Sequence, residues 1–321
     1  MQTFNSSKRL SVIIPYFPGD HLETFEGTLV SVLESLSGST EILVLDAQGY
    51  EDTWNIKDEG VRFISLPTGT TEVTGMNVGI RHALGEIIHP LRAGARVCGG
   101  WLDEVMPHFE NRNVATVIPM LVDPLWQKVV TIGVQLRLNG QIREVRRYKQ
   151  FLKNNLTFAP HVGAAFFRRS LLEKLGYFDT SFTLQNAYLD YSLLTKLFEY
   201  ETSVESDCCI SLMTERSVAD KPTFAAGVEE ERLFQRWIDR FNRKSTCSHL
   251  SFINTEFCRH LPSPGAFTQL AGRLTTMMSN YDRKEHKEKC EAMKKLFATV
   301  PPQQITLEEK EITEQPHPVA A

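Results

Sequence analysis

The sequence lacks the features typical of membrane-spanning, secreted and nucleic-acid-binding chains. No run of about 18 apolar residues occurs, so we expect no membrane-spanning helix. The N-terminus is polar before its first apolar run, unlike a secretory signal. The net charge is −4, whereas nucleic-acid-binding domains are strongly basic. The six cysteines have no regular spacing and fit reduced thiols, so we expect a cytoplasmic protein that binds no nucleic acid.

The first half of the chain alternates short apolar runs with helical patterns. Residues 10–17, 41–46 and 61–67 are apolar runs of strand length, and 86–91 is a fourth. Between them, apolar residues recur every three or four positions over 22–36 and 73–84, which predicts helices. Strands that alternate with helices in this way favour a doubly wound, mostly parallel sheet flanked by helices, so the predicted fold class is α/β.

The second half has a different pattern. Residues 129–145 predict a hairpin that turns at Asn139-Gly140, and 161–179 predict a strand that runs into a helix ending at Gly176. Residues 222–298 are mostly helical, with one apolar stripe around Leu233 and Trp237 and another from Phe267 to Tyr281. We therefore predict a domain over 1–221, a helical extension over 222–298 and a disordered tail over 299–321.

Four segments stand out along the chain: "LSVIIPYFPGD", "EILVLDAQGYED", "GMNVGIRHALGEII" and "AAFFRRSLLEKLGYFDTSF". In this order they resemble segments of the family 2 glycosyltransferases, which have the GT-A fold and use nucleotide sugars. The third is the most specific of them, because it is similar to the family's Asn-x-Gly-Ile-x-x-Ala-x-Gly-Glu-Tyr-Ile. The resemblance covers roughly residues 10–215 and leaves the helical extension outside. It implies a GT-A fold.

The resemblance also implies a reaction. Family members transfer a sugar from a nucleotide-sugar donor to an acceptor hydroxyl. Mg²⁺ or Mn²⁺, held by an Asp-x-Asp motif, neutralises the charge that develops on the leaving diphosphate. In inverting members a carboxylate, usually in a Glu-Asp-x-Asp segment, removes the proton of the acceptor.

This chain departs from both acidic motifs. Arg92 stands in the place of the first aspartate of Asp-x-Asp, and Gly94 in the place of the second. Ala187 and Tyr188 replace the Glu-Asp pair, while Asp190 keeps the last aspartate. A metal requirement is therefore doubtful, and we predict no metal ligands and no certain cofactor. An arginine could replace the metal, because its guanidinium pairs bidentately with phosphate oxygens.

The predicted site residues combine the resemblance with these departures. The candidate catalytic residues are Asp190, as the base, and Asp179 as the second choice. The candidate donor-binding residues are Pro15, Tyr16, Asp46, Asn77, Arg92 and Arg96. Five of them have a structural alternative: a turn aspartate at Asp46, a helix-scaffold amide at Asn77, solvated surface at the two arginines and a helix-surface aspartate at Asp190.

Two functions remain open at this point. The first is a glycosyltransferase that acts on an unidentified glycan or other acceptor, without a metal. The second is an inactive relative that serves as a nucleotide- or partner-binding module, since the loss of metal ligands and base lowers rates by orders of magnitude. In either case the helical region 222–298 is a possible surface for homo-oligomer formation.

Overall fold

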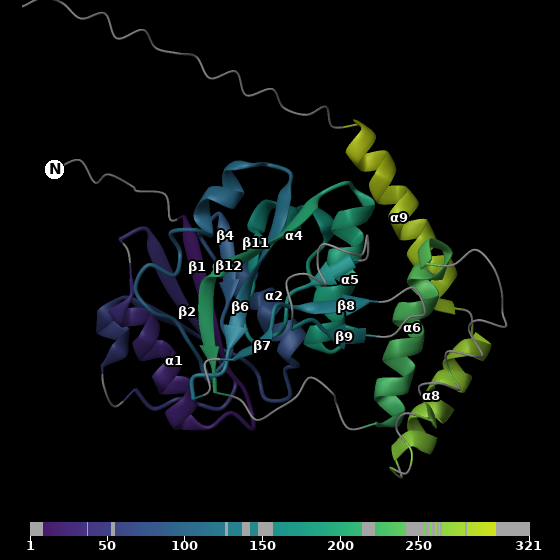
Figure 1. Cartoon of the computed structure of the whole chain (residues 1–321), viewed down its shortest axis with the longest axis horizontal. Coiled ribbons are helices and arrows are strands. Elements are labelled where there is room, and N and C mark those ends of the chain that lie inside the picture. The colour runs from purple at the N-terminus through teal and green to yellow at the C-terminus, as the bar shows by residue number, and fades with distance from the viewer. Residues whose placement is uncertain are drawn as a thin grey trace, which may run out of the picture.

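A computed structural model (Figure 1) describes residues 9–36, 38–52, 55–125, 128–136, 142–146, 157–213, 222–241, 253, 257–258, 261, 263, 265–279 and 281–299. No helix within these residues is long and apolar enough to cross a membrane. The predicted hairpin turn at Asn139-Gly140 lies outside the described residues.

A mixed sheet forms the centre of the molecule. Its strands are β1 (Leu10–Tyr16), β2 (Thr40–Asp46), β3 (Val61–Ser65), β4 (Ile87–Pro90), β5 (Ala95–Arg96), β6 (Val114–Val122), β7 (Val129–Thr131), β11 (Phe166–Arg168) and β12 (Glu201–Leu212). They follow the order β3-β2-β1-β4-β11-β6-β12-β5, with β7 beside β6. The first four are parallel, as predicted, whereas β11 runs antiparallel to both β4 and β6. The parallel half of the sheet therefore ends at β4.

A second, small antiparallel sheet lies beside the main one. It contains β8 (Val134–Leu136), β9 (Ile142–Glu144) and β10 (Thr157–Ala159) in the order β10-β8-β9. Short 3-10 helices η1 (Ile56–Glu59) and η2 (Met106–Glu110) complete the connections.

Helices cover the two faces of the main sheet with separate cores. On one face α1 (Leu22–Glu34) packs Phe25 and Leu29 against the side chains of β1 and β2. On the other face lie α2 (Glu72–His82), α4 (Arg169–Leu175) and α5 (Leu184–Leu197). Gly79 lets α2 approach closely, because a Cβ there would lie 3.0 Å from Leu45 Cδ2. The faces are therefore distinct, and a residue near the sheet edge can point to only one of them.

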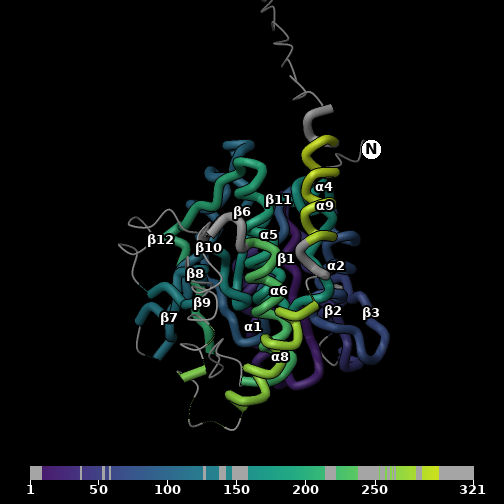
Figure 2. The backbone as a smooth tube through the Cα atoms, turned by 90° about the vertical axis from the view of Figure 1, so that its right-hand side faces the viewer, coloured from purple at the N-terminus to yellow at the C-terminus, as the bar shows by residue number. Residues whose placement is uncertain are grey.

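The C-terminal helices are α6 (Phe224–Phe241), α8 (Gly265–Ser279) and α9 (Tyr281–Thr299). Figure 1 shows them together on the side that carries α5, away from α1 and β2, and Figure 2 views that side. Trp237 of α6 is buried within the same core as α5. The predicted domain boundary at 221 falls among residues 214–221, which are outside the described residues, and it stays a prediction, as does the tail.

Candidate functional site

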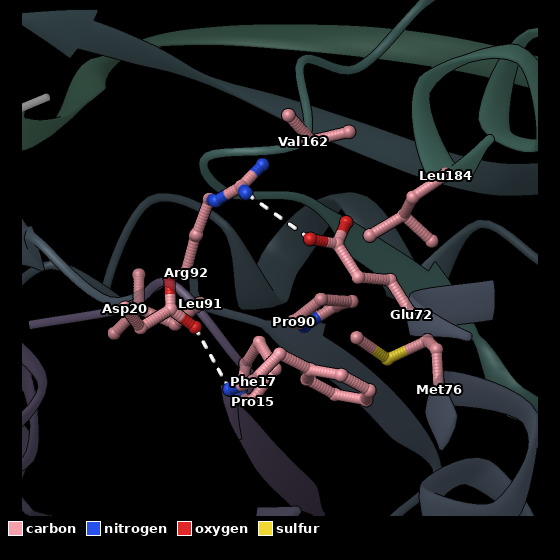
Figure 3. Close-up of a pocket in the computed structure, with 10 residues that line it drawn as sticks. All are labelled: Pro15, Phe17, Asp20, Glu72, Met76, Pro90, Leu91, Arg92, Val162 and Leu184. Carbon is pink, nitrogen blue, oxygen red and sulfur yellow. Dashed lines mark hydrogen bonds and ion pairs between the residues drawn. The ribbon is translucent and has the colours of Figure 1, made fainter. Parts of the chain in front are cut away.

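A pocket opens where β1 and β4 end, at the carboxyl-terminal edge of the parallel strands (Figure 3). This is the edge at which open α/β sheets bind ligands. Its lining consists of Pro15, Phe17, Asp20, Glu72, Met76, Pro90, Leu91, Arg92, Val162 and Leu184. The walls are mostly apolar, and the charged side chains among them are Asp20, Glu72 and Arg92. Such a site suits a ligand with an apolar body and an anionic group.

Arg92 is the cation of this pocket. Its backbone N–H donates to the Gly163 carbonyl at 3.0 Å, which fixes the loop after β4. Its Nη2 lies 3.2 Å from Glu72 Oε1, and the side chains are 24% and 41% exposed. Thr71 caps α2 by accepting from Thr74 N–H, so Glu72 is held in the first turn of the helix. The Arg92–Glu72 pair is partly open to solvent, so an anionic ligand can compete for the guanidinium.

Gly94, in the place of the second acid, is committed to a turn. Its φ is +91°, a left-handed conformation that favours glycine. Its N–H donates to Thr28 Oγ1 at 2.9 Å, so the turn is held against α1. This part of the loop therefore contributes shape to the site and no ligand for a metal.

Arg96 does not share the pocket with Arg92. It follows in β5, and its guanidinium lies over Gly27 of α1, where an added Cβ would be 2.5 Å from Nη2. Because α1 covers the face of the sheet opposite to α2, the geometry separates the two arginines. Of the two candidate arginines, only Arg92 lines this pocket, and donor binding by Arg96 stays a prediction.

The three donor-site candidates on β1 and β2 have different surroundings. Pro15 lines the pocket. Tyr16 points to the α1 face and stacks on Phe25, with ring centroids 4.5 Å apart. Asp46 accepts N–H groups from three residues of the turn that follows it, Gln48, Gly49 and Tyr50, at 3.1, 2.8 and 2.8 Å. Asp46 thus organises this turn at the sheet edge, and most of its acceptor capacity is used.

Asn77 is a scaffold residue in this structure. It is buried on α2, its side-chain nitrogen donates to the Phe178 carbonyl at 2.8 Å, and its oxygen accepts from Phe178 N–H at 3.1 Å. This pair of bonds joins α2 to the segment after α4. Since both ends of the amide are engaged, the structural alternative for Asn77 describes its environment better than donor binding.

Asp179 and Asp190, the candidate bases, come together with α6 and do not line the pocket. Arg236 Nη1 lies 2.7 Å from Asp179 Oδ2 and 3.6 Å from Asp190 Oδ2. Trp237 Nε1–H donates to Asp190 Oδ1 at 2.8 Å. Both carboxylates therefore hold α6 against the domain, and the role of Asp190 as the base, with Asp179 as the second choice, stays a prediction.

The pKa values of the two aspartates move in opposite directions. For Asp179, burial favours the neutral acid, but Arg236 and the hydrogen bonds from Ser181 outweigh it and hold the pKa at about 2. For Asp190, burial dominates and raises the pKa, against Arg236 and the Trp237 hydrogen bond. Tyr188 and Tyr191, which neighbour Asp190 in the sequence, predict a carboxyl pKa raised by burial, and the pKa of Asp190 is shifted in that direction.

Asp20, Glu72 and His161 are not among the predicted site residues. Asp20 accepts from Phe17 N–H at 2.9 Å and lines the pocket with Glu72. His161 adjoins Val162 of the lining; burial, aided by Arg92, lowers its pKa to about 4. For Glu72, the signal in the sequence is a Thr-Glu pair at the start of a helix. This pair predicts the helix cap and not the direction of the Glu72 side chain.

The residues at this edge do not fit a divalent cation. Hard cations take oxygen ligands, yet the loop after β4 offers the guanidinium of Arg92 and the glycine Gly94. Of the carboxylates present, Glu72 is paired with Arg92 and Asp20 with a backbone N–H. Within the described residues, no group of three or more histidines, cysteines and acids could hold a metal.

Comparison with known proteins connects this geometry to one family. Residues 11–176, just over half of the chain, match the model for glycosyl transferase family 2. No protein of curated function matches the chain in sequence. Among solved structures, GalNAc-T7 with UDP, GalNAc and Mn²⁺ gives a TM-score of 0.59 at 14% identity, covering 94% of this chain and 60% of that one. Residues 1–349 of S. aureus TarS give 0.54 at 13% identity, with 90% and 91% covered. At these identities the likeness concerns the fold.

Proposed function

This chain belongs to glycosyl transferase family 2 and has the GT-A fold, and on that premise we propose that its rim pocket binds the diphosphate of a nucleotide-sugar donor. The sugar then passes to an acceptor hydroxyl. In this proposal the Arg92 guanidinium supplies the positive charge that the family draws from a metal. The structural neighbour GalNAc-T7 was solved with UDP, which supports a nucleoside diphosphate as the ligand class.

One observation carries the proposal: a partly exposed guanidinium stands in the pocket where the Asp-x-Asp acids would be. Glu72 is its only side-chain partner among the described residues, and that contact is long enough, at 3.2 Å, to be exchanged. Phosphate oxygens form shorter, charge-assisted bonds with arginine, frequently two at once. As the bond between sugar and diphosphate breaks, negative charge grows on the diphosphate, and a fixed guanidinium stabilises that charge.

The apolar lining gives the pocket a second role. Phe17, Met76 and Leu184 surround the charged group on the α2 side (Figure 3). Apolar walls lower the local dielectric, which strengthens the attraction between Arg92 and a phosphate. Asp46 shapes the neighbouring turn and Pro15 the floor, so in this proposal both act by positioning.

The test compares two arginines of one loop. Nucleoside diphosphates of uridine, guanosine, cytidine and thymidine are titrated calorimetrically against the wild type, with Mn²⁺ and with chelator. Arg92→Ala should weaken the binding of the tightest of these ligands about 10- to 100-fold. This is the effect of losing about 1.5–3 kcal/mol from a charged hydrogen bond. Arg96→Ala is the matched control and should bind like the wild type.

Three results would contradict the proposal. An unchanged affinity in Arg92→Ala removes the guanidinium from the site, and equal losses in both variants indicate a general effect of charge. Binding that requires Mn²⁺ means that the acidic ligands lie elsewhere in the chain. Binding that persists in chelator and disappears in Arg92→Ala supports a site that works without a metal.

A second candidate, a nucleotide-binding module without transfer, is favoured by the position of Asp190. That carboxylate is buried beneath Trp237, while Ala187 and Tyr188, which replace the Glu-Asp pair, are buried neutral side chains. Only Asp20 and Glu72 remain as carboxylates in the pocket lining. Release of nucleoside diphosphate from a bound nucleotide sugar, with or without an acceptor, separates the candidates: turnover supports the transferase, and tight binding without turnover supports the module.

A further inference from the structure

His161 lies beside the loop that carries Arg92. Residues 161–164 form a turn next to that loop, with a bridge between Leu91 and Ala164 and the Arg92 N–H bonded to the Gly163 carbonyl. Val162, the next residue in the turn, lines the pocket. The imidazole is 5% exposed. A histidine that is so well buried beside the cation of a candidate site needs a physical explanation.

The hydrogen bond at Nδ1 fixes the form of this histidine. The Gly163 N–H donates to His161 Nδ1 at 2.9 Å, so Nδ1 carries no proton. Burial, with a smaller contribution from the nearby Arg92 charge, lowers the pKa to about 4, and the ring is neutral at physiological pH. A neutral imidazole has one N–H group, and this N–H must then be at Nε2. His161 therefore presents an N–H donor that is fixed in direction by its own turn.

The Nε2–H of His161 has no acceptor within the described part of the chain, yet it is not sealed from solvent. Fully buried polar atoms without a partner include Nε2 of His89 and not that of His161. His89 is a core residue: its Nδ1 bonds the Ala165 carbonyl at 2.6 Å and its ring stacks on Phe166 at 3.9 Å. Of these two neutral histidines, His161 is the one whose Nε2 is not fully buried, and it lies directly behind the lining, next to the pocket residue Val162.

We propose that His161 is a second ligand-binding group of the pocket, donating its Nε2–H to a phosphate oxygen that Arg92 also engages. The inference rests on the proposed function, since it assigns a further donor to the same diphosphate. A neutral donor suits this position, because a second buried cation beside Arg92 would carry a large desolvation and repulsion cost. Together the two groups would hold two oxygens of one diphosphate from adjacent loops.

Two substitutions separate the two nitrogens of the ring. In His161→Asn the side-chain oxygen can accept the Gly163 N–H, as asparagine does in turns, while the outer donor is lost. In His161→Gln the longer amide can place an N–H near the position of Nε2. Inorganic pyrophosphate is the probe, titrated calorimetrically in chelator. We expect the dissociation constant of His161→Asn to be about tenfold larger than that of the wild type, and the affinity to recover at least in part in His161→Gln. The melting temperature of the free His161→Asn protein should stay within about 2–3 °C of the wild type.

A spectroscopic measurement reports on the ring itself. Long-range ¹H–¹⁵N spectra of the wild type should show His161 as the neutral tautomer protonated on Nε2. Its Nε2 resonance should shift on addition of pyrophosphate, and that of His89 should stay unchanged. A purely structural histidine would show the tautomer and no shift.

The outcomes distinguish this inference from the proposed function. If Arg92→Ala abolishes pyrophosphate binding and His161→Asn binds like the wild type, the inference is wrong and the proposed function stands. If both His161 variants weaken binding only in step with a lowered melting temperature, the role is structural and the inference is again wrong. If the wild type binds neither pyrophosphate nor any nucleoside diphosphate, both proposals are overturned.

Discussion

Two arginine–carboxylate contacts in this molecule have the same chemistry and different surroundings. Arg92 meets Glu72 at 3.2 Å at the edge of the sheet, with side chains 24% and 41% exposed. Arg236 meets Asp179 at 2.7 Å beneath α6, with 8% and 24% exposed. Arg236 also lies 4.6 Å above the Phe182 ring and reaches Asp190. The Arg236 contact is buried and holds a helix, whereas the Arg92 contact is more open and can be exchanged for a ligand.

The difference bears on the predicted base. The partners of Asp190 come from α6, which lies outside the resemblance. These contacts give the Asp190 carboxylate a structural role beneath α6, and its role as a base stays a prediction. Removal of Arg236 and removal of Arg92 should therefore affect different properties of the protein.

The largest expected effect is on stability. Arg236→Ala should lower the free energy of unfolding by about 3 kcal/mol, because it leaves two carboxylates under α6 without their cation. Arg92→Ala, the matched control at the sheet edge, should lower it by less than about 1 kcal/mol. Urea unfolding followed by tryptophan fluorescence measures both values. Equal losses would mean that the two contacts are equivalent and would remove the basis of the comparison.

The next effect is a pH dependence that belongs to the α6 contact alone. The pKa of Asp179 in the folded protein is about 2, below its ordinary value of 3.8. A lowered folded pKa contributes stability above the unfolded pKa, and this stability is lost as the pH falls from about 4 to about 2. Asp179→Asn should therefore lose about 2 kcal/mol relative to the wild type at pH 7, and the difference should shrink towards zero near pH 2.

Asp190, in the same contact, should give a pH dependence of stability with the opposite sign. Burial raises its folded pKa, so the stability linked to its protonation is present at low pH and decreases as the pH rises through that pKa. The free energy of unfolding of Asp190→Asn, relative to that of the wild type, should thus be most favourable at neutral pH and less favourable in acid. Unfolding curves between pH 2 and 7 measure both variants, and identical pH profiles for the two would contradict the assignment.

The local pattern predicted the elements of the fold well. Apolar periodicity predicted α1 and α2 and the strands β1 to β4 within a few residues. Gly176 predicted the end of α4, where its φ of +91° closes the helix. These features depend on residues close in sequence. The strand before α4 was predicted as well, but the antiparallel direction of β11 and its place between β4 and β6 were not predictable, because tertiary packing sets the neighbours of a strand.

The site was predictable only in part for the same reason. Arg92 was identified because the resemblance implies an aspartate at its position, so that an arginine there stands out. The partner of Asp179 is 57 positions away in an unrelated segment, so no spacing could indicate it. The helix α8 makes the point again: its apolar Phe267 and Met278 are 61% and 81% exposed, while Arg273 is buried against Glu231 of α6. A helix pattern shows which face is apolar, and only the partner decides which face is buried.

The smallest effect on stability is expected at Glu72, where the substitution should instead change binding. Glu72→Gln removes the negative partner of Arg92, so the affinity for pyrophosphate should rise about three- to tenfold. The free energy of unfolding should change by less than about 1 kcal/mol, since the pair is partly exposed. Glu23→Gln is the matched control, because Glu23 occupies the first turn of α1 as Glu72 does that of α2 and does not line the pocket. Calorimetry at fixed ionic strength compares the two. If both variants tighten binding equally, the gain reflects net charge alone. If Glu72→Gln weakens binding, Glu72 itself contacts the ligand, and Arg92 does not act as the free cation of the pocket.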